Sequence, residues 1–233
     1  MDNKIKAIIF DCDGTLVDSE YAHYLSWRHA LQLQGGDLTL EEYAFYVGKT
    51  VQANARLLAE KIGSNAPHKI IEDKRAYYDV LQNAGLPAIQ PTVDFVLALA
   101  KEKERYGIKL GCASAARKPG ILTNLKHLKI DHLFDIVLSG QDDLSDYTDP
   151  EGVNKPKPYI YLQAAKLLRL KPEECLVIED SQSGVTAGVQ AGCLTIAIPN
   201  DFTRKQDLSH SHLQLDSLDF LSLEEFLQYA ISQ

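Results

Sequence analysis

Short apolar runs alternate with amphipathic stretches along most of the chain. The runs are apolar throughout, which is typical of parallel strands that helices cover on both faces. The strands that they predict are Ala7–Phe10, Ile108–Ala113, Ile136–Ser139, Cys175–Glu179 and Thr195–Ile198. The amphipathic stretches predict helices at Val93–Arg105, Arg117–His127, Pro158–Leu168, Ser183–Ala191 and Leu223–Ile231. This order of elements predicts an α/β fold built on a doubly wound parallel sheet.

One segment, residues 19–87, breaks the alternation because it contains no convincing strand. Its helical patterns cover Ala22–Leu33, Leu40–Val47, Gln52–Lys61 and His68–Asn83. A crossover between two strands rarely needs so many helices. We therefore expect residues 19–87 to form an inserted α-helical cap domain over the carboxyl ends of the strands, and residues 1–18 with 88–233 to form the catalytic core. The alternative is that these helices pack rigidly on the sheet as ordinary crossover structure.

Charge and composition narrow the range of partners. The 233-residue chain has a formal net charge of −8 and shows no strong local basic patch. Such a chain repels the phosphate backbone of nucleic acids, so we expect a small anionic metabolite as the partner. No apolar run is long enough for a signal peptide or a membrane span, which favours the cytoplasm and no membrane partner. The widely spaced cysteines are expected to be reduced thiols in the core: Cys12, Cys112, Cys175 and Cys193.

Polar residues follow or end four of the predicted strands, where a parallel sheet gathers its functional groups. Two carboxylates one residue apart, Asp11 and Asp13, follow the first strand; they repel each other and favour a site for a hard metal ion. The other groups are Ser114 after the second strand, Lys155 after the third, and Glu179 with Asp180 at the end of the fourth. Taken singly, such residues are also typical of turns, helix caps and solvated loops.

Together, the four groups supply what phosphoryl transfer requires. A carboxylate nucleophile, an acid/base, two groups that hold a phosphate and a divalent-cation site indicate transfer through an aspartyl-phosphate. A non-catalytic, receiver-like phospho-acceptor module uses similar residues. Its accepting aspartate follows the third strand, however, whereas Ile136–Ser139 leads here to Gly140 and Gln141. That module also lacks a helical cap, so it ranks behind an enzyme.

The same groups resemble the motifs of the haloacid dehalogenase superfamily. The matching segments are Asp11-Cys-Asp-Gly-Thr-Leu-Val-Asp-Ser19, Ser114, Lys155-Pro-Lys-Pro-Tyr-Ile-Tyr161 and Glu179-Asp-Ser-Gln-Ser-Gly-Val-Thr-Ala-Gly188. The match covers nearly the whole chain. Helices inserted after the first strand resemble the α-helical cap class that β-phosphoglucomutases share with many phosphosugar phosphatases. The resemblance implies a Rossmann-like core and Mg²⁺ as the cofactor.

The resemblance also implies a role for each catalytic residue. Asp11 would attack phosphorus, and Asp13 would protonate the leaving oxygen and later deprotonate the group that attacks the phospho-enzyme. Ser114 and Lys155 would hold the transferring phosphoryl group, with Lys157 as the competing lysine. A dehalogenase needs no acid at the position of Asp13, so dehalogenation is set aside.

The implied metal ligands are carboxylates and one backbone oxygen. They are Asp11, the backbone carbonyl of Asp13, and Asp180, with Glu179 close by or bound through water. Lys155 would offset the charge of these carboxylates.

Residues of the cap and of the loop after the second strand bear on the substrate. The candidate substrate-binding residues are His23, Trp27, Gly48, Lys49, Lys74, Ala115 and Arg117. His23 and Trp27 share a helix face and match a histidine and a tryptophan of β-phosphoglucomutases, but packing between cap helices explains them equally well. Lys74 or Arg75 could supply a second cation, although a solvated helix face is the simpler interpretation.

Two positions favour a phosphatase over a mutase. Val51 stands where the mutase loop carries an arginine for the distal phosphate, and Ala116 stands where a second phosphate-binding serine would lie. A mutase must hold a bisphosphate in two orientations, so losing two polar contacts favours hydrolysis. We therefore expect a Mg²⁺-dependent phosphatase for a small sugar or polyol phosphate, with a β-phosphoglucomutase-type mutase as the alternative.

An acidic loop, residues 141–154, is longer than the usual connection between the third strand and the lysine. We expect it to be solvated. The alternative is that it lines one side of the mouth of the active site and disfavours highly anionic substrates.

Overall fold

The computed structural model describes residues 5–219 and 224–226. The contacts between Cα atoms divide the chain into two compact units, Met1–Val17 with Ala88–Gln233 and Asp18–Pro87. This division lies within one residue of the expected domain boundaries; the roles of core and cap stay a prediction. Each unit is described by itself.

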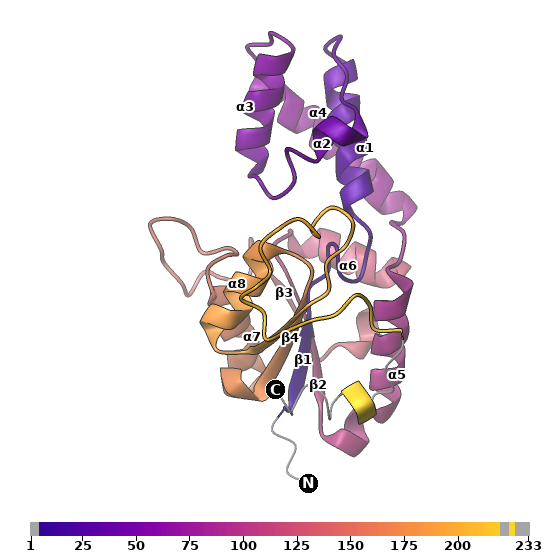
Figure 1. The fold of residues 1–233 in the computed structure, drawn as a ribbon, viewed down its shortest axis with the longest axis vertical. Coiled ribbons are helices and arrows are strands. Elements are labelled where there is room, and N and C mark those ends of the chain that lie inside the picture. The colour runs from indigo at the N-terminus through magenta and orange to yellow at the C-terminus, as the bar shows by residue number, and fades with distance from the viewer. Residues whose placement is uncertain (1–4, 220–223, 227–233) are drawn as a thin grey trace. The chain divides into compact units, whose positions relative to one another are not determined.

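The larger unit is built on one parallel sheet (Figure 1). Its strands are β1 (Ala7–Phe10), β2 (Lys109–Ser114), β3 (Ile136–Ser139), β4 (Cys175–Glu179), β5 (Leu194–Ala197) and β6 (Leu213–Gln214). They pair in the order β3-β2-β1-β4-β5-β6, and every pair is parallel. The chain runs outwards from β1 to β3 and then crosses back to β4, so β1 and β4 flank the topological switch point. The predicted doubly wound α/β fold is confirmed.

Helices cover both faces of this sheet. They are α5 (Gln90–Tyr106), α6 (Lys118–His127), α7 (Tyr159–Leu168) and α8 (Gln182–Ala191), with short 3₁₀ turns at Asp131–Leu133 and Pro172–Glu174. Figure 1 shows α7 and α8 on one side and α5 on the other. Ile9 of β1 belongs to a buried cluster with Ile160 of α7. Its neighbour Phe10 faces the other way, with its ring centroid 6.3 Å from that of Phe95 in α5. A strand buried on both faces explains the uninterrupted apolar run.

The edge of the sheet and the end of the chain differ from the predicted elements. The two-residue strand β6 was not predicted. The expected helix Leu223–Ile231 lies largely outside the described residues, although residues 224–226 are helical. Phe226 is buried there, and its ring centroid lies 4.7 Å from that of Phe95. All four cysteines are free and buried, as expected.

The smaller unit is helical. Residues 18–87 contain no strand; their helices are α1 (Glu20–Gln32), α2 (Leu40–Tyr43), α3 (Val51–Lys61) and α4 (Pro67–Ala84). Helix α2 is shorter than the expected Leu40–Val47. It begins with a capping box between Thr39 and Glu42, and the turn after it is held by the Asn54 side chain, which donates to the Tyr46 carbonyl oxygen at 2.9 Å. Leu31, Leu58 and Ile70 are fully buried in this unit.

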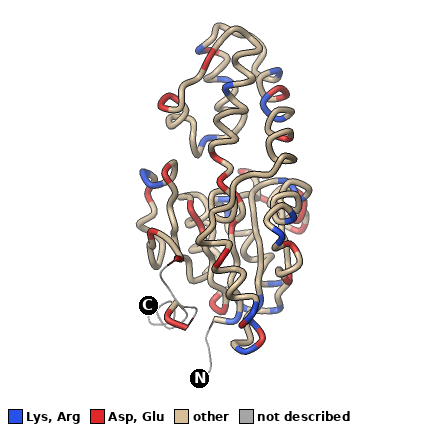
Figure 2. The backbone as a smooth tube through the Cα atoms, turned by 90° about the vertical axis from the view of Figure 1, so that its right-hand side faces the viewer, with Lys and Arg blue, Asp and Glu red and all other residues tan. Residues whose placement is uncertain are grey.

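Charged residues of both signs are spread along both units, as Figure 2 shows. Among the described residues, no helix is long and apolar enough to cross a membrane. The cytoplasmic location stays a prediction.

Candidate active site

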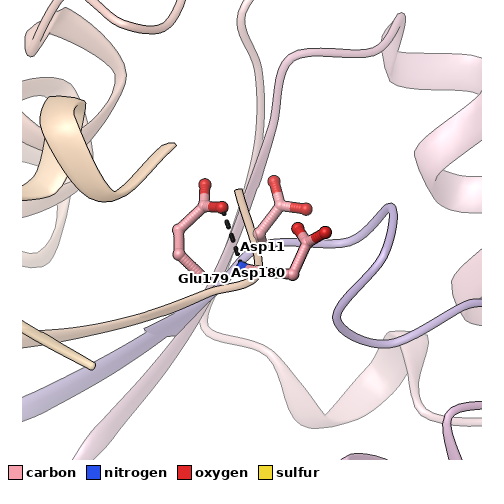
Figure 3. Close-up of side chains that lie close together, drawn as sticks. All are labelled: Asp11, Glu179 and Asp180. Carbon is pink, nitrogen blue, oxygen red and sulfur yellow. Dashed lines mark hydrogen bonds between the residues drawn. The ribbon is translucent and has the colours of Figure 1, made fainter. Parts of the chain in front are cut away.

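Three carboxylates meet where β1 and β4 end. Asp11, Glu179 and Asp180 each offer an oxygen, and these oxygens all lie within 4.8 Å of one another (Figure 3). The adjacent strands hold them there, since the Asp11 N–H donates to the Ile178 carbonyl at 2.9 Å. The three residues are only 5%, 1% and 4% exposed. Buried carboxylates this close repel one another unless positive charge is supplied.

Lys155 supplies part of that charge. Its Nζ lies 2.5 Å from Asp11 Oδ1 and 2.7 Å from Glu179 Oε1, and it donates to the Ala113 carbonyl at 2.9 Å. All three protons of the ammonium group therefore have acceptors. Lys157, the competing lysine, instead pairs with Glu151 at 2.6 Å. The structure thus brings Lys155, and not Lys157, to the carboxylate cluster.

One ammonium group does not balance three carboxylates. The pKa of Asp11 is raised to about 8: burial has the largest effect and raises it, Lys155 lowers it, and the negative charges of Glu179 and Asp13 raise it. Burial disfavours the charged form of Lys155, yet Asp11 and Glu179 hold its pKa well above its usual value. A second positive charge at the three oxygens would let Asp11 stay ionised at neutral pH. Oxygen donors in a buried, anionic cluster fit a hard divalent cation.

Glu179 is held on both of its oxygens. Oε1 accepts from the Tyr161 hydroxyl at 2.7 Å as well as from Lys155. Oε2 accepts from the backbone N–H of Asp180 at 3.1 Å, drawn as the dashed line in Figure 3, and from the Ser181 hydroxyl at 3.2 Å. Oε2 also accepts from the Ser181 backbone N–H at 3.4 Å, so five donor groups fix the orientation of this carboxylate.

Asp180 is held from the loop that follows β5. Asn200 Nδ2 donates to Asp180 Oδ2 at 2.8 Å and to the Gly14 carbonyl at 3.3 Å. Gly14 has a φ of +87°, and a Cβ there would lie 2.4 Å from Asp180 Oδ2. Only glycine accommodates both the left-handed backbone and the close approach of Asp180.

The sequence did not assign roles to Tyr161 and Asn200. Tyr161 ends the segment that starts at Lys155, so its place in the motif was visible but its partner was not. Asn200 follows the end of β5 by three residues. The rule that functional groups gather after strand ends could have singled it out.

Asp13 and Ser114 are brought together from β1 and β2. The Ser114 hydroxyl, 1% exposed, donates to Asp13 Oδ2 at 3.0 Å. It also accepts from the Ala116 N–H at 3.0 Å. Ala115 is partly buried, and Arg117 is exposed at the start of α6. The acid/base candidate is thus in contact with a phosphate-holding candidate.

The acidic loop is exposed along most of its length, as expected of a solvated loop, but it is also anchored to the larger unit. Leu144 is 4% exposed and belongs to the core cluster. Asp143 pairs with Lys118 at 2.7 Å and also accepts from the Ser139 N–H at 2.8 Å. The loop is tied to the larger unit because its carboxylates have donors there and its leucine has a core position.

Three candidate substrate-binding residues meet within the smaller unit. Lys74 Nζ lies 2.9 Å from His23 Nδ1, 5.6 Å from the ring centroid of Trp27 and 4.5 Å from that of Tyr78. Lys74 is 6% exposed, so the expectation of a solvated helix face is wrong for it, whereas Arg75 is exposed. Burial, and then the positive charge of Lys74, lower the pKa of His23 well below its usual value.

Gly48 and Lys49 lie in the turn region between α2 and α3. The Lys49 ammonium group lies 3.8 Å from the ring centroid of Phe45 and donates to the Phe45 carbonyl. Its role in binding a substrate stays a prediction, as do the roles of the other candidates of this unit.

The fold and the site define a protein of the Rossmann-like α/β class whose carboxylates gather at the switch point of the sheet. The chain belongs to the haloacid dehalogenase-like hydrolase family, whose model matches residues 5–192. The resemblance seen in the motifs is therefore confirmed. Membership in a hydrolase family also sets aside the receiver-like module.

Several related proteins match this chain along most of their length. The chain is similar to hexitol phosphatase A of Escherichia coli, with 30% identity over 94% of each protein. It is 28% identical to the phosphorylated carbohydrates phosphatase of Thermotoga maritima, over 81% of this chain and 82% of that one. The crystal structure of β-phosphoglucomutase from Clostridium difficile matches with a TM-score of 0.74 and 25% identity, over 98% of this chain and 97% of that one.

Proposed function

We propose that the protein is a Mg²⁺-dependent phosphatase that hydrolyses a small sugar or polyol phosphate through an aspartyl-phosphate on Asp11. The observation that carries the proposal is the buried cluster of Asp11, Glu179 and Asp180 around Lys155, with Asp13 and Ser114 beside it. Mg²⁺ held by Asp11, Asp180 and Glu179 would neutralise negative charge on the phosphate oxygens.

The proposed reaction consists of two displacements at phosphorus. In the first, an Asp11 oxygen bonds to phosphorus while the bond to the leaving oxygen breaks, and Asp13 gives that oxygen its proton. In the second, Asp13 takes a proton from water as the water oxygen attacks phosphorus, which releases phosphate and restores Asp11. Ser114 and Lys155 would hold the transferring phosphoryl group: the ammonium group of Lys155 supplies positive charge beside it, and the Ser114 hydroxyl shares its one proton between Asp13 Oδ2 and a phosphoryl oxygen.

The substrate class is inferred from the relatives and from the helical unit. Hexitol phosphatase A and the phosphorylated carbohydrates phosphatase act on phosphorylated polyols or carbohydrates, as their names state. Residues 19–87 would act as the cap that selects the leaving group, with 1–18 and 88–233 as the catalytic core. Within the cap we assign recognition to His23, Trp27 and Lys74, whose side chains already lie close together.

Further recognition would come from outside that cluster. The assigned positions are Gly48 and Lys49 in the cap and Ala115 and Arg117 after β2.

The first test is phosphate release with Mg²⁺ from a panel of hexose, pentose and hexitol phosphates. Chelating the metal with EDTA should stop release, and Mg²⁺ should restore it. Asp11→Asn keeps the size of the side chain but removes the nucleophile, so kcat should fall by at least about 10³-fold while the thermal unfolding curve stays cooperative. Asp146→Asn is the control, because that carboxylate is 61% exposed and pairs with Lys166 at the surface. Substantial turnover by Asp11→Asn would remove it from the nucleophile role.

A mutase is the second candidate, favoured by the match to β-phosphoglucomutase and by the contact of His23 with Lys74 in the cap. Val51 and Ala116, which replace an arginine and a serine expected of a mutase, place it second. Supplying β-glucose 1-phosphate and following both isomerisation and phosphate release separates the two. Isomerisation that far outruns release would reverse this order.

A further inference from the structure

Both ends of the acidic loop reach one carbonyl oxygen next to Ser114. Gln141, two residues after the end of β3, and Asn154, directly before Lys155, each donate a side-chain amide N–H to the Ala115 carbonyl at 3.1 Å. A carbonyl oxygen only accepts, so the amide nitrogens, and not the amide oxygens, must face it. The orientation of both side chains is therefore defined.

The next peptide units are held from the same side. The Ser139 hydroxyl donates to the Ala116 carbonyl at 2.7 Å, and the Lys118 N–H donates to Asp142 at 2.7 Å. The backbone from residue 115 to residue 118 therefore has partners on β3 and on the acidic loop. These bonds anchor the acidic loop to the core, although most of its residues are exposed.

The held peptide continues to the acid/base candidate. The Ala116 N–H belongs to the same peptide unit as the Ala115 carbonyl, and it donates to Ser114 Oγ at 3.0 Å. Ser114 Oγ in turn donates to Asp13 Oδ2 at 3.0 Å. Because a peptide unit is planar, a rotation that moves its carbonyl oxygen also moves its N–H. Fixing the carbonyl oxygen of Ala115 thus fixes the donor that orients Ser114.

We propose that Gln141 and Asn154 are positioning residues that fix the Ala115–Ala116 peptide and, through Ser114, the carboxyl group of Asp13. This inference rests on the proposed function, since it gives Asp13 the role of acid. Small displacements of a reacting group are costly in rate. The two amides therefore matter most for substrates whose leaving group needs a proton.

Two variants remove the amide donors in different ways. Gln141→Leu takes away the amide at similar size and adds no charge. Asn154→Asp keeps Oδ1, which accepts from the Lys155 N–H at 2.9 Å, but replaces the donating NH₂ by an acceptor. Asp146→Asn, in the same loop, is the matched control because its carboxylate pairs with Lys166 at the surface.

The readout is kcat/KM with Mg²⁺ for phenyl phosphate and for p-nitrophenyl phosphate, measured beside the thermal midpoint. p-Nitrophenolate leaves readily without a proton, whereas phenolate departs faster when an acid protonates it. In both variants we expect kcat/KM for phenyl phosphate to fall about tenfold, which corresponds to the free energy of roughly one net hydrogen bond. The value of kcat/KM for p-nitrophenyl phosphate should fall less than about twofold. The control should match the wild type.

Equal losses on the two substrates, or no loss in Gln141→Leu and Asn154→Asp, would overturn the inference. Asp13→Asn serves as the reference for a missing acid and should show the same leaving-group pattern, more strongly. Full activity of Asp13→Asn, or no phosphate release by the wild type from any hexose, pentose or hexitol phosphate, would instead count against the proposed function itself. The two failures are thus told apart by which protein gives the unexpected result.

Discussion

Tyr161 is the most buried of the hydroxyl groups that contact the carboxylate cluster. It is fully buried, and burial, followed by the negative charge of Glu179, raises the pKa of its hydroxyl well above the usual value. With its pKa raised, the hydroxyl keeps its proton at neutral pH and remains a hydrogen-bond donor to Glu179. We infer that Tyr161 offsets part of the cost of burying that carboxylate.

Replacing Tyr161 by phenylalanine tests this contribution. The change removes one oxygen and leaves Glu179 with one donor fewer, so we expect the free energy of unfolding to fall by about 1–3 kcal/mol. Urea unfolding measures the loss. Tyr159→Phe is the matched control, since its hydroxyl bonds to Asp149 at 3.1 Å away from the carboxylate cluster, and it should cost no more than about 0.5 kcal/mol. Equal decreases in the free energy of unfolding of the two variants would show that the hydrogen bond to Glu179 stabilises the protein no more than the one to Asp149.

Some residues of the site could be read from the sequence because the backbone direction places them. Asp11, Ser114 and Glu179 occupy strand ends, and parallel strands end at one edge of the sheet. The contacts of Tyr161 with Glu179 and of Asn200 with Asp180 span 18 and 20 residues. They depend on which side of a helix or loop faces the cluster, which strand periodicity does not determine.

At the scale of elements, the first turn of α8 packs closely against the Glu179 carboxylate. Gly184 lies in its first turn, where a Cβ would come within 1.8 Å of Glu179 Oε1. Glu179 cannot move aside without breaking its bonds to Lys155 and Tyr161. The glycine therefore lets the helix approach the strand end closely.

We expect Gly184→Ala to destabilise the protein by roughly 2–3 kcal/mol through overpacking, against the gain of about 1 kcal/mol that alanine normally brings to a helix. Thermal or urea unfolding gives the value, and phosphatase turnover should fall with it because Glu179 is displaced. Ser183→Ala, at the exposed neighbouring position, is the control and should be close to neutral. A stabilised Gly184→Ala protein would mean that Glu179 can move aside without lowering the free energy of unfolding.

His23 links the stability of the helical unit to pH. Its pKa in the folded protein lies well below the usual 6.5, because of burial and then because of Lys74. Below about pH 6.5 the unfolded chain binds a proton here that the folded chain does not. Stability must therefore decrease as the pH falls below that value, by up to about 1.4 kcal/mol per pH unit.

As the pH falls, we expect the free energy of unfolding to decrease more steeply in the wild type than in His23→Gln. Glutamine can still accept from Lys74 but does not titrate. Unfolding free energies at intervals between pH 8 and pH 5 give the slopes. His132→Gln, whose ring is 71% exposed, should keep the wild-type slope. Identical slopes for His23→Gln and the wild type would show that His23 binds a proton as readily in the folded chain as in the unfolded one.

Periodicity located the long elements better than the short ones. Strands of four or more apolar residues and helices with a buried stripe carry a repeating signal, and most of them were predicted within a few residues. β6 has two residues, Leu213 and Gln214, and two residues define no period. The expected extension of α2 to Val47 failed because a turn held by Asn54 replaces the last helical residues.

At the scale of the whole molecule, the chain leaves and re-enters the larger unit at one place. Val17 and Ala88 form an antiparallel bridge, and the Ile89 N–H donates to the Leu16 carbonyl at 2.9 Å. Just beyond this point, the Asp18 N–H donates to the Pro87 carbonyl at 2.9 Å. Opposed residues of such a bridge lie about 5 Å apart, a distance that a two-residue turn spans in β-hairpins.

A chain in which residues 18–87 are replaced by Asn-Gly should therefore fold on its own. The sheet, its covering helices and the carboxylate cluster all belong to the larger unit, and closing a shorter connection costs less entropy. We expect cooperative thermal unfolding and a far-ultraviolet circular dichroism spectrum with less helix than that of the full chain. As a control, the same two residues inserted between Gly63 and Ser64, in the link between α3 and α4, leave both crossing points intact and should preserve the full spectrum. A shortened chain that unfolds without a cooperative transition would mean that the larger unit depends on residues 18–87, and that the two units are not separate domains.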